Sequence, residues 1–159
     1  MAAIVSVNVG FDLWCDLINN IDDFVDRVVM EVLSFLFMDN LKVEVSVLLT
    51  NDRFIRELNL RYRNINKATN VLAFRYVEDL DHLKNKHYPA QLGDVVLSAE
   101  TIRSQSQELE VSFAEHAAYM LIHGTLHLLG HDHQKDEEAE IMEDIEEKIL
   151  RAIVAKKLI

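Results

Sequence analysis

Cysteine, glycine and proline are scarce in this chain of 159 residues. Cys15 is the single cysteine, which excludes an internal disulfide and a metal site built from several thiolates and is typical of a reducing compartment. With 4 glycines and 1 proline, the sequence contains few turn signals and shows no linker, repeat or low-complexity tract. We therefore expect one helix-rich domain over residues 1–159, close to the commonest domain size.

Long apolar runs and an excess of basic residues are also missing. No stretch reaches the roughly 18 apolar residues of a membrane-spanning helix, and no charged segment of the signal-peptide type precedes the first apolar run. We expect a soluble cytoplasmic protein with no membrane partner. The 16 Lys and Arg against 27 Asp and Glu give a net charge of −11, which argues against a protein that coats nucleic acid through its overall field.

Hydrophobic periodicity predicts an α+β fold. Apolar residues alternate or run together, as in short strands, at 4–9, 43–49, 71–74 and 92–97. Three- and four-residue spacing predicts helices at 21–35, 54–62, 99–109, 113–129 and from 135 onward, while 78–89 reads as an excursion. The expected architecture is a small mixed sheet of about four strands packed by helices.

Two expectations about these elements concern side chains. Tyr62 and Phe74 fall on the apolar positions of their elements, so we expect both in the core rather than stacked on nucleic-acid bases. In the last helix an apolar stripe includes Met142 and Ile149, and we expect the eight carboxylates between Asp136 and Glu147 on its solvated faces.

Five of the seven histidines lie in one short segment around HGTLHLLGHDH. The spacing of His123 and His127 places two imidazoles one turn apart on the same face of a helix. Gly130 can end that helix and let the chain reverse, so that His133 reaches the same ion. Three neutral nitrogen ligands with an open fourth position are typical of catalytic zinc sites, where a bound water becomes a nucleophile near neutral pH.

The alternative is that His123 and His127 are hydrogen-bonded helix histidines and His133 is a surface residue. Three histidines at these steps, with a glycine at the turn, favour one metal ion. Zinc suits imidazole best, although nickel, copper or another divalent metal would accept the same nitrogens. The neighbouring His131, Asp132 and His116 are candidates for orienting the ligands, or else ordinary surface and core residues.

The histidine spacing is also that of metzincin peptidases, in which a glutamate follows the first histidine as general base. In this chain that residue is Gly124, which has no group to accept a proton. A peptidase of that type is therefore disfavoured, and an amidase or peptidase would need a base from elsewhere.

The histidine motif, together with LNLRYRNINKATNVLAF at 58–74 and LGDVVLSAET at 92–101, resembles the YbeY-type endoribonucleases, which are ribosomal RNA maturation factors. The resemblance covers most of the chain from about 42 to 147. It implies a zinc-dependent endoribonuclease specific for single strands, with a zincin-like metal-site helix. It also implies a cytoplasmic role at the 3′ end of 16S ribosomal RNA on the small ribosomal subunit and in ribosome quality control.

By this resemblance the metal ligands are His123, His127 and His133, and Arg63 matches the family's functional arginine. A guanidinium suits that role because it can bind two phosphoryl oxygens as charge develops on them. The chain departs from the family pattern at four positions, which puts its substrate preference in question: Ala68, Ala73, Arg75 and His131.

Basic residues are concentrated in one segment. Residues 41–75 carry a net charge of +4, whereas the rest of the chain carries −15. This distribution predicts a local RNA-binding surface that includes Arg61, Lys67 and Arg75, with an ordinary mixed-charge helix as the alternative. A metal-binding ribosome assembly factor without catalytic activity, docked through this segment, is a further hypothesis.

Overall fold

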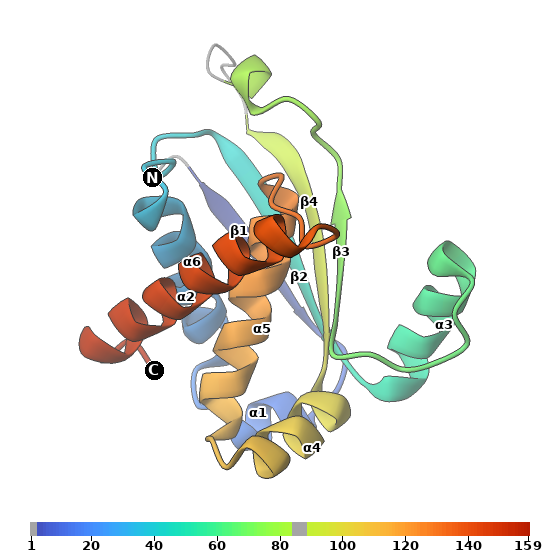
Figure 1. Ribbon diagram of the computed structural model, residues 1–159. Coiled ribbons are helices and arrows are strands. Elements are labelled where there is room, and N and C mark those ends of the chain that lie inside the picture. Colours follow the sequence, from blue (N-terminus) through green and yellow to red (C-terminus); the bar gives the residue numbers. More distant parts are fainter. Residues whose placement is uncertain (1–2, 84–88) are drawn as a thin grey trace.

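The computed structural model describes residues 3–83 and 89–159, and the strands of this part form one four-stranded sheet (Figure 1). Its order is β1-β2-β4-β3, with bounds β1 (Ile4–Val9), β2 (Val43–Thr50), β3 (Val71–Arg75) and β4 (Ala90–Ser98). The strands β1, β2 and β4 are parallel, and β3 runs antiparallel to β4 at one edge. The predicted α+β class and the mixed sheet are confirmed.

The helices follow the predicted periodicity to within a few residues. They are α1 (Leu13–Leu17), α2 (Ile21–Phe35), α3 (Asp52–Arg63), α4 (Ala99–Leu109), α5 (Phe113–Leu128) and α6 (Asp136–Ala155). The expected excursion at 78–89 contains a 3-10 helix, Leu80–Leu83, and its part at 84–88 lies outside the described residues. In the described part of the chain, no helix is both long and apolar enough to cross a membrane.

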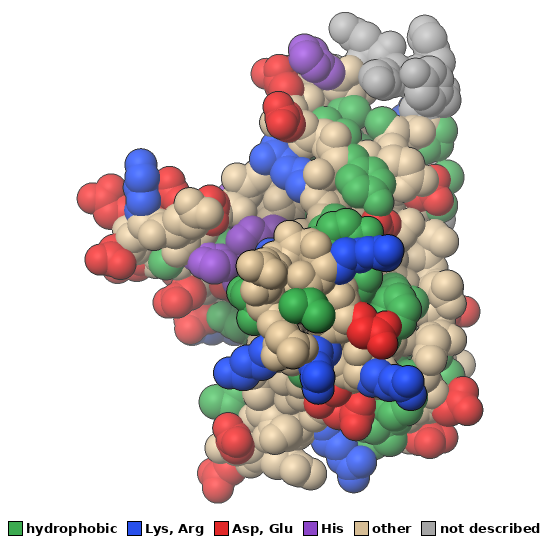
Figure 2. Space-filling model, turned by 90° about the vertical axis from the view of Figure 1, so that its right-hand side faces the viewer, with side chains coloured by type: hydrophobic (Ala, Val, Ile, Leu, Met, Phe, Trp, Pro, Cys, Tyr) green, Lys and Arg blue, Asp and Glu red, His purple; other side chains and the backbone are tan. Residues whose placement is uncertain are grey.

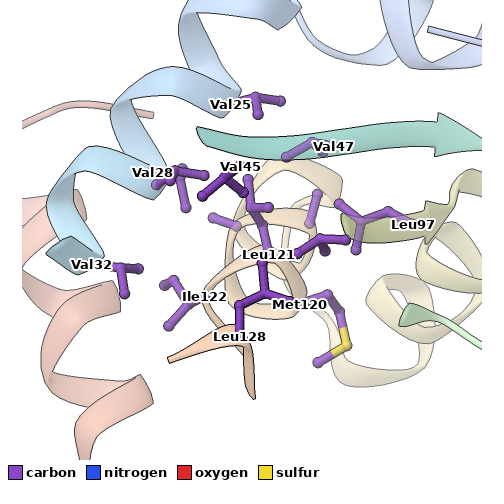
Figure 3. Packing of buried hydrophobic residues seen from close by; sticks show 14 of the residues in the cluster. Val25, Val28, Val32, Val45, Val47, Leu97, Met120, Leu121, Ile122 and Leu128 are labelled. Atoms are coloured by element: carbon purple, nitrogen blue, oxygen red, sulfur yellow. The ribbon is translucent and has the colours of Figure 1, made fainter. Parts of the chain in front are cut away.

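The main hydrophobic core lies between the sheet and the helices α2 and α5 (Figure 3). Valines of α2 and leucines of α5 pack against the inward side chains of the parallel strands. The residues that meet there are almost fully excluded from water: Val25, Val28, Val32, Val45, Val47, Leu97, Leu121 and Leu128. Burial on one face explains the strict alternation seen in β2. The core thus fixes α5, the helix that carries two histidines of the motif.

The opposite face of the sheet is covered only in part, by α3. A small cluster of Ile55, Leu72 and Val96 joins this helix to β3 and β4. The expectation that Tyr62 lies in the core is wrong, because its side chain is 61% exposed. The buried residues of α3 are Ile55 and Asn59, so the far end of the helix projects from the sheet. Phe74, the other aromatic residue expected in the core, is half-buried.

A backbone irregularity brings β3 and β4 unusually close. The pairing of β2 with β4 shifts register between Glu44 and Val45, whose partners are Gln91 and Gly93. Gly93 has a φ of 152°, and a Cβ there would lie 2.1 Å from the Phe74 carbonyl oxygen. Only glycine fits such an approach. Gly93 thus lets the two strands pair at this point, where its partner in β3 is Arg75.

Candidate metal centre

Three histidines converge at the C-terminal end of α5. His123 and His127 lie one turn apart on the helix, which ends at Leu128. Gly130, with a φ of 96°, adopts the left-handed conformation that reverses the chain. One ring nitrogen from each of His123, His127 and His133 lies within 4.8 Å of the others. The structure thus brings together the three residues that spacing singled out.

The spacing of the nitrogens fits a small tetrahedral ion. The Nε2 atoms of His123 and His127 are 3.2 Å apart. Zinc–nitrogen bonds of about 2.0 Å at tetrahedral angles separate two ligand atoms by about 3.3 Å. Among the described residues, this trio is the cluster of metal-ligating side chains that could hold an ion.

The surroundings of His127 keep its imidazole neutral. Burial, followed by the neighbouring His123 and His133 and by Arg63, lowers the pKa of His127 to about 4, although Asp132 opposes the shift. A neutral ring is the form that donates a lone pair to a metal. At neutral pH His127 is therefore a ligand rather than a cation.

Glu146 of α6 was not anticipated from the sequence. Its carboxylate is 2% exposed, and its Oε2 lies 2.7 Å from Nδ1 of His123. A proton on Nδ1 donated to this carboxylate leaves Nε2 free to face His127. The expectation that all eight carboxylates of the last helix are solvated is therefore wrong for Glu146. The feature of the sequence that could have revealed it is its position, because Glu146 falls at helical spacing among Met142, Ile149 and Ile153, which are also buried.

The histidines open into a hollow of about 670 Å³, here called the histidine pocket. Arg63, at the last turn of α3, lines it opposite α5. No hydrogen bond or ion pair holds the Arg63 guanidinium among the described residues, so it can turn toward an anionic group in the pocket. The loop before β3 contributes Asn70, whose side chain donates to Gln105 Oε1.

Arg75 also lines the histidine pocket, but its guanidinium is already engaged. It donates to the carbonyl oxygens of Val77 and Glu78, both at 2.6 Å, and lies close against Gly130. His131 and Asp132 line the same hollow. Asp132 Oδ1 accepts the backbone N–H of His133 and so stabilises the turn that carries this histidine.

The other expected site residues lie elsewhere. His116 is buried two turns before His123 on α5, where its Nε2 is 2.9 Å from Gln105 Oε1, and burial lowers its pKa. Lys67 lines a separate polar hollow with Arg53 and Arg56. Arg61 is exposed on α3 and does not line the histidine pocket.

Gly124 has a packing role. A Cβ at this position would lie 2.6 Å from Cγ1 of Val95 and 3.1 Å from Cγ2 of Val71. The helix therefore rests directly on the sheet at this point, between the two helical histidines. There is no space for the glutamate that metzincin peptidases carry at the same position.

Known proteins resemble this chain over most of its length. Residues 16–154 match the family model described as endoribonuclease YbeY. A protein named endoribonuclease YbeY from Wolbachia sp. subsp. Drosophila simulans is 39% identical over 149 residues, which cover 94% of this chain and 95% of the relative. A second, from Wolbachia pipientis subsp. Culex pipiens, is 37% identical over 91% of this chain and 90% of the relative.

A solved structure shares the fold. The solution structure of TM1509 from Thermotoga maritima superimposes with a TM-score of 0.62 at 21% identity. The match covers 96% of this chain and 91% of the other.

Proposed function

The chain belongs to the endoribonuclease YbeY family, and from this premise we propose that the histidine pocket is where it cleaves RNA. The protein is an endoribonuclease that acts in ribosomal RNA processing. The observation that carries the proposed location is the convergence of three imidazole nitrogens within 4.8 Å in a hollow that Arg63 also lines. The proposed substrate is single-stranded, at the 3′ end of small-subunit ribosomal RNA, in the cytoplasm.

We assign the metal to His123, His127 and His133, and zinc is the ion that best fits three imidazoles at this spacing. Such an ion, when bound, supplies Lewis acidity toward water or a phosphoryl oxygen. Glu146 orients His123 through the Nδ1 hydrogen bond, and Asp132 holds the backbone of His133. The ring of His123 and the backbone of His133 are therefore held in place before an ion arrives.

Arg63 binds the phosphate at the cleaved bond. Its guanidinium has no partner among the described residues and faces the same hollow as the ligands. Phosphodiester cleavage increases the charge on the phosphoryl oxygens, and two parallel N–H donors stabilise that charge more than they stabilise the ground state.

The other two hypotheses are not favoured. A metzincin-type peptidase lacks its base at Gly124, where packing against Val95 leaves no space for a side chain. A non-catalytic assembly factor does not fit membership of an endoribonuclease family.

The test is cleavage of single-stranded RNA by the purified protein, with and without a chelator, beside two variants. We expect His127→Ala to lose both metal and cleavage, and Arg63→Ala to retain metal while losing at least about tenfold in kcat/KM. Metal content is measured by atomic emission. Cleavage by His127→Ala at the rate of the unaltered protein, or loss of metal from Arg63→Ala, would contradict the assigned roles.

A further inference from the structure

A second hollow lies on the face of the sheet that α3 only partly covers. It has a volume of about 470 Å³, and we call it the aromatic groove. Aromatic rings line it together with polar groups of the strands: Phe54, Tyr62, Phe74, Tyr76, Asn8 and Asp94. The hydroxyl of Tyr76 donates to Asp94, which holds that ring in place.

The aromatic groove and the histidine pocket share β3 as a wall. Side chains of a strand alternate between faces, so Ala73 and Arg75 line the histidine pocket while Phe74 lines the groove. The same division occurs on α3, where Arg63 faces the pocket and the preceding Tyr62 faces the groove. Because β3 is the last strand of the sheet, a chain leaving the pocket reaches the groove by passing around a single strand.

The rings in the groove are unusually open to solvent. Tyr62 is 61%, Tyr76 56% and Phe54 42% exposed. Tyr62 meets Phe74 edge-on with ring centroids 5.3 Å apart, which leaves a face of the exposed ring available. Exposed large apolar side chains gathered in one hollow mark an interaction site rather than ordinary surface.

A basic side chain lies beside the groove. Arg61 is exposed on α3 and follows Phe54 by seven residues, so it shares the face of the helix that lines the groove. The lining itself contains one carboxylate, Asp94, which accepts a hydrogen bond from the hydroxyl of Tyr76. Figure 2, which views the molecule from the side of α3, shows several Lys and Arg side chains there, with hydrophobic and acidic side chains among them. Single-stranded nucleic acid is bound by this combination, in which basic groups follow the phosphates and aromatic rings stack on the bases.

We propose that the aromatic groove binds unpaired bases of the RNA strand next to the scissile phosphate, with Tyr62 and Tyr76 as stacking platforms. The proposal rests on the proposed function, because the histidine pocket defines where the strand is cut. RNA is favoured over a protein segment as the occupant because only β3 separates the groove from the histidine pocket, which Arg63 lines, and because Arg61 is exposed beside the groove. The groove would select single strands, since bases paired in a duplex expose no face for stacking.

The experiment measures binding of a fluorescein-labelled, unpaired RNA of about 12 nucleotides by anisotropy, in the presence of chelator so that the RNA stays intact. Tyr62→Leu removes the aromatic face, and Tyr62→Phe keeps it. Phe37→Leu is a control, because Phe37 is 92% exposed yet lines neither hollow. We expect Tyr62→Leu to raise Kd about fivefold or more, and Tyr62→Phe and Phe37→Leu to stay within about twofold, below the loss of one stacked base.

A second readout places the contact. A set of RNAs of the same sequence carries a fluorescent base analogue, each at a different position. At one position we expect a fluorescence change caused by stacking, and this change should be lost with Tyr62→Leu and kept with Tyr62→Phe. Equal Kd values for Tyr62→Leu and the unaltered protein, with melting temperatures unchanged, would overturn the proposal that the groove binds RNA bases. A protein segment would then remain as its occupant. Failure of the metal-loaded, unaltered protein to cleave the RNA would instead overturn the proposed function, whatever the binding result.

Discussion

Glu146 is the residue whose role depends most on its surroundings. On the outside of α6 it would be one of many solvated carboxylates, but it occupies a buried position between Met142 and Ile149. A buried carboxylate requires partners to offset its lost hydration. It has His123 at 2.7 Å, and together with burial it raises the pKa of Tyr119 to about 12. The hydroxyl of Tyr119 therefore stays protonated beside it.

Removing the charge of Glu146 should weaken metal binding without unfolding the protein. Glu146→Gln keeps the volume and one acceptor oxygen, so His123 remains in place but becomes a poorer ligand. We expect zinc affinity to fall about 10- to 100-fold, measured by competition with a chelating dye.

Glu143→Gln is the matched control for this change. Glu143 lies one turn earlier on α6 and is exposed. Together with Glu146 and His123 it lines a hollow of about 320 Å³. It should retain the affinity of the unaltered protein. Equal losses in both variants would show that general negative charge, rather than the contact with Nδ1, supports the ligand.

At the scale of elements, the contact between α5 and the sheet fixes the site. Gly124 lets the helix rest on Val95 of β4 and Val71 of β3, so the helix axis lies close to the strand that separates pocket from groove. The histidines on either side of this contact, His123 and His127, therefore have a rigid base. A ligand pair on a helix gains precision when the helix itself cannot shift.

Gly124→Ala should destabilise the protein although alanine favours helix formation. The helix-propensity gain is about 1 kcal/mol, whereas forcing a Cβ to 2.6 Å from a β-branched valine requires backbone movement that costs about 1–3 kcal/mol or more. Urea unfolding followed by circular dichroism measures the difference. A more stable variant would show that the helix is not in tight contact with the sheet.

The double variant Gly124→Ala with Val95→Ala separates the clash from other effects. If the new methyl group meets Val95, the two changes should be less destabilising together than their sum, by about 1 kcal/mol. Strict additivity would place the strain elsewhere.

At the scale of the whole molecule, charge is separated rather than averaged. The segment 41–75 supplies α3 and β3 and carries +4, and the remainder carries −15, with much of the negative charge on α6. We therefore expect RNA to be attracted to the side that carries α3 and repelled elsewhere. The net charge of −11 excludes indiscriminate coating of nucleic acid and is compatible with one local RNA-binding surface.

RNA binding should depend on salt, but with a modest slope. The logarithm of the association constant should fall with the logarithm of salt concentration with a slope between about −1 and −3, because few phosphates are contacted and each contributes about −0.7. Anisotropy titrations over a range of NaCl concentrations provide the measurement. Arg61→Gln should make the slope shallower by about 0.7.

Lys148→Gln is the control for the salt experiment. Lys148 lies on α6 and is paired with Asp144 at 2.8 Å, away from the basic segment. For Lys148→Gln, the slope of RNA affinity against salt concentration should equal that of the unaltered protein. A change as large as that of Arg61→Gln would mean that overall charge, not the face with α3, controls binding.

Residue patterns along the chain predicted the α+β class, most element positions and the three converging histidines. These properties are carried by local spacing: a period of two or of 3.6 residues, and a glycine placed to reverse the chain after α5. The segregation of basic residues into 41–75 was equally readable, since it is a property of composition along the chain.

Contacts between side chains of distant segments could not be predicted in this way, because they depend on how the elements pack. Glu146 reaches His123 because α6 crosses α5, and Tyr62 is exposed because α3 projects from a half-covered sheet. Arg75 is bound to backbone carbonyls by the turn that follows β3, although its charge suggested an RNA contact. Such outcomes depend on how elements pack, and periodicity within one element carries no information about the neighbour it will face.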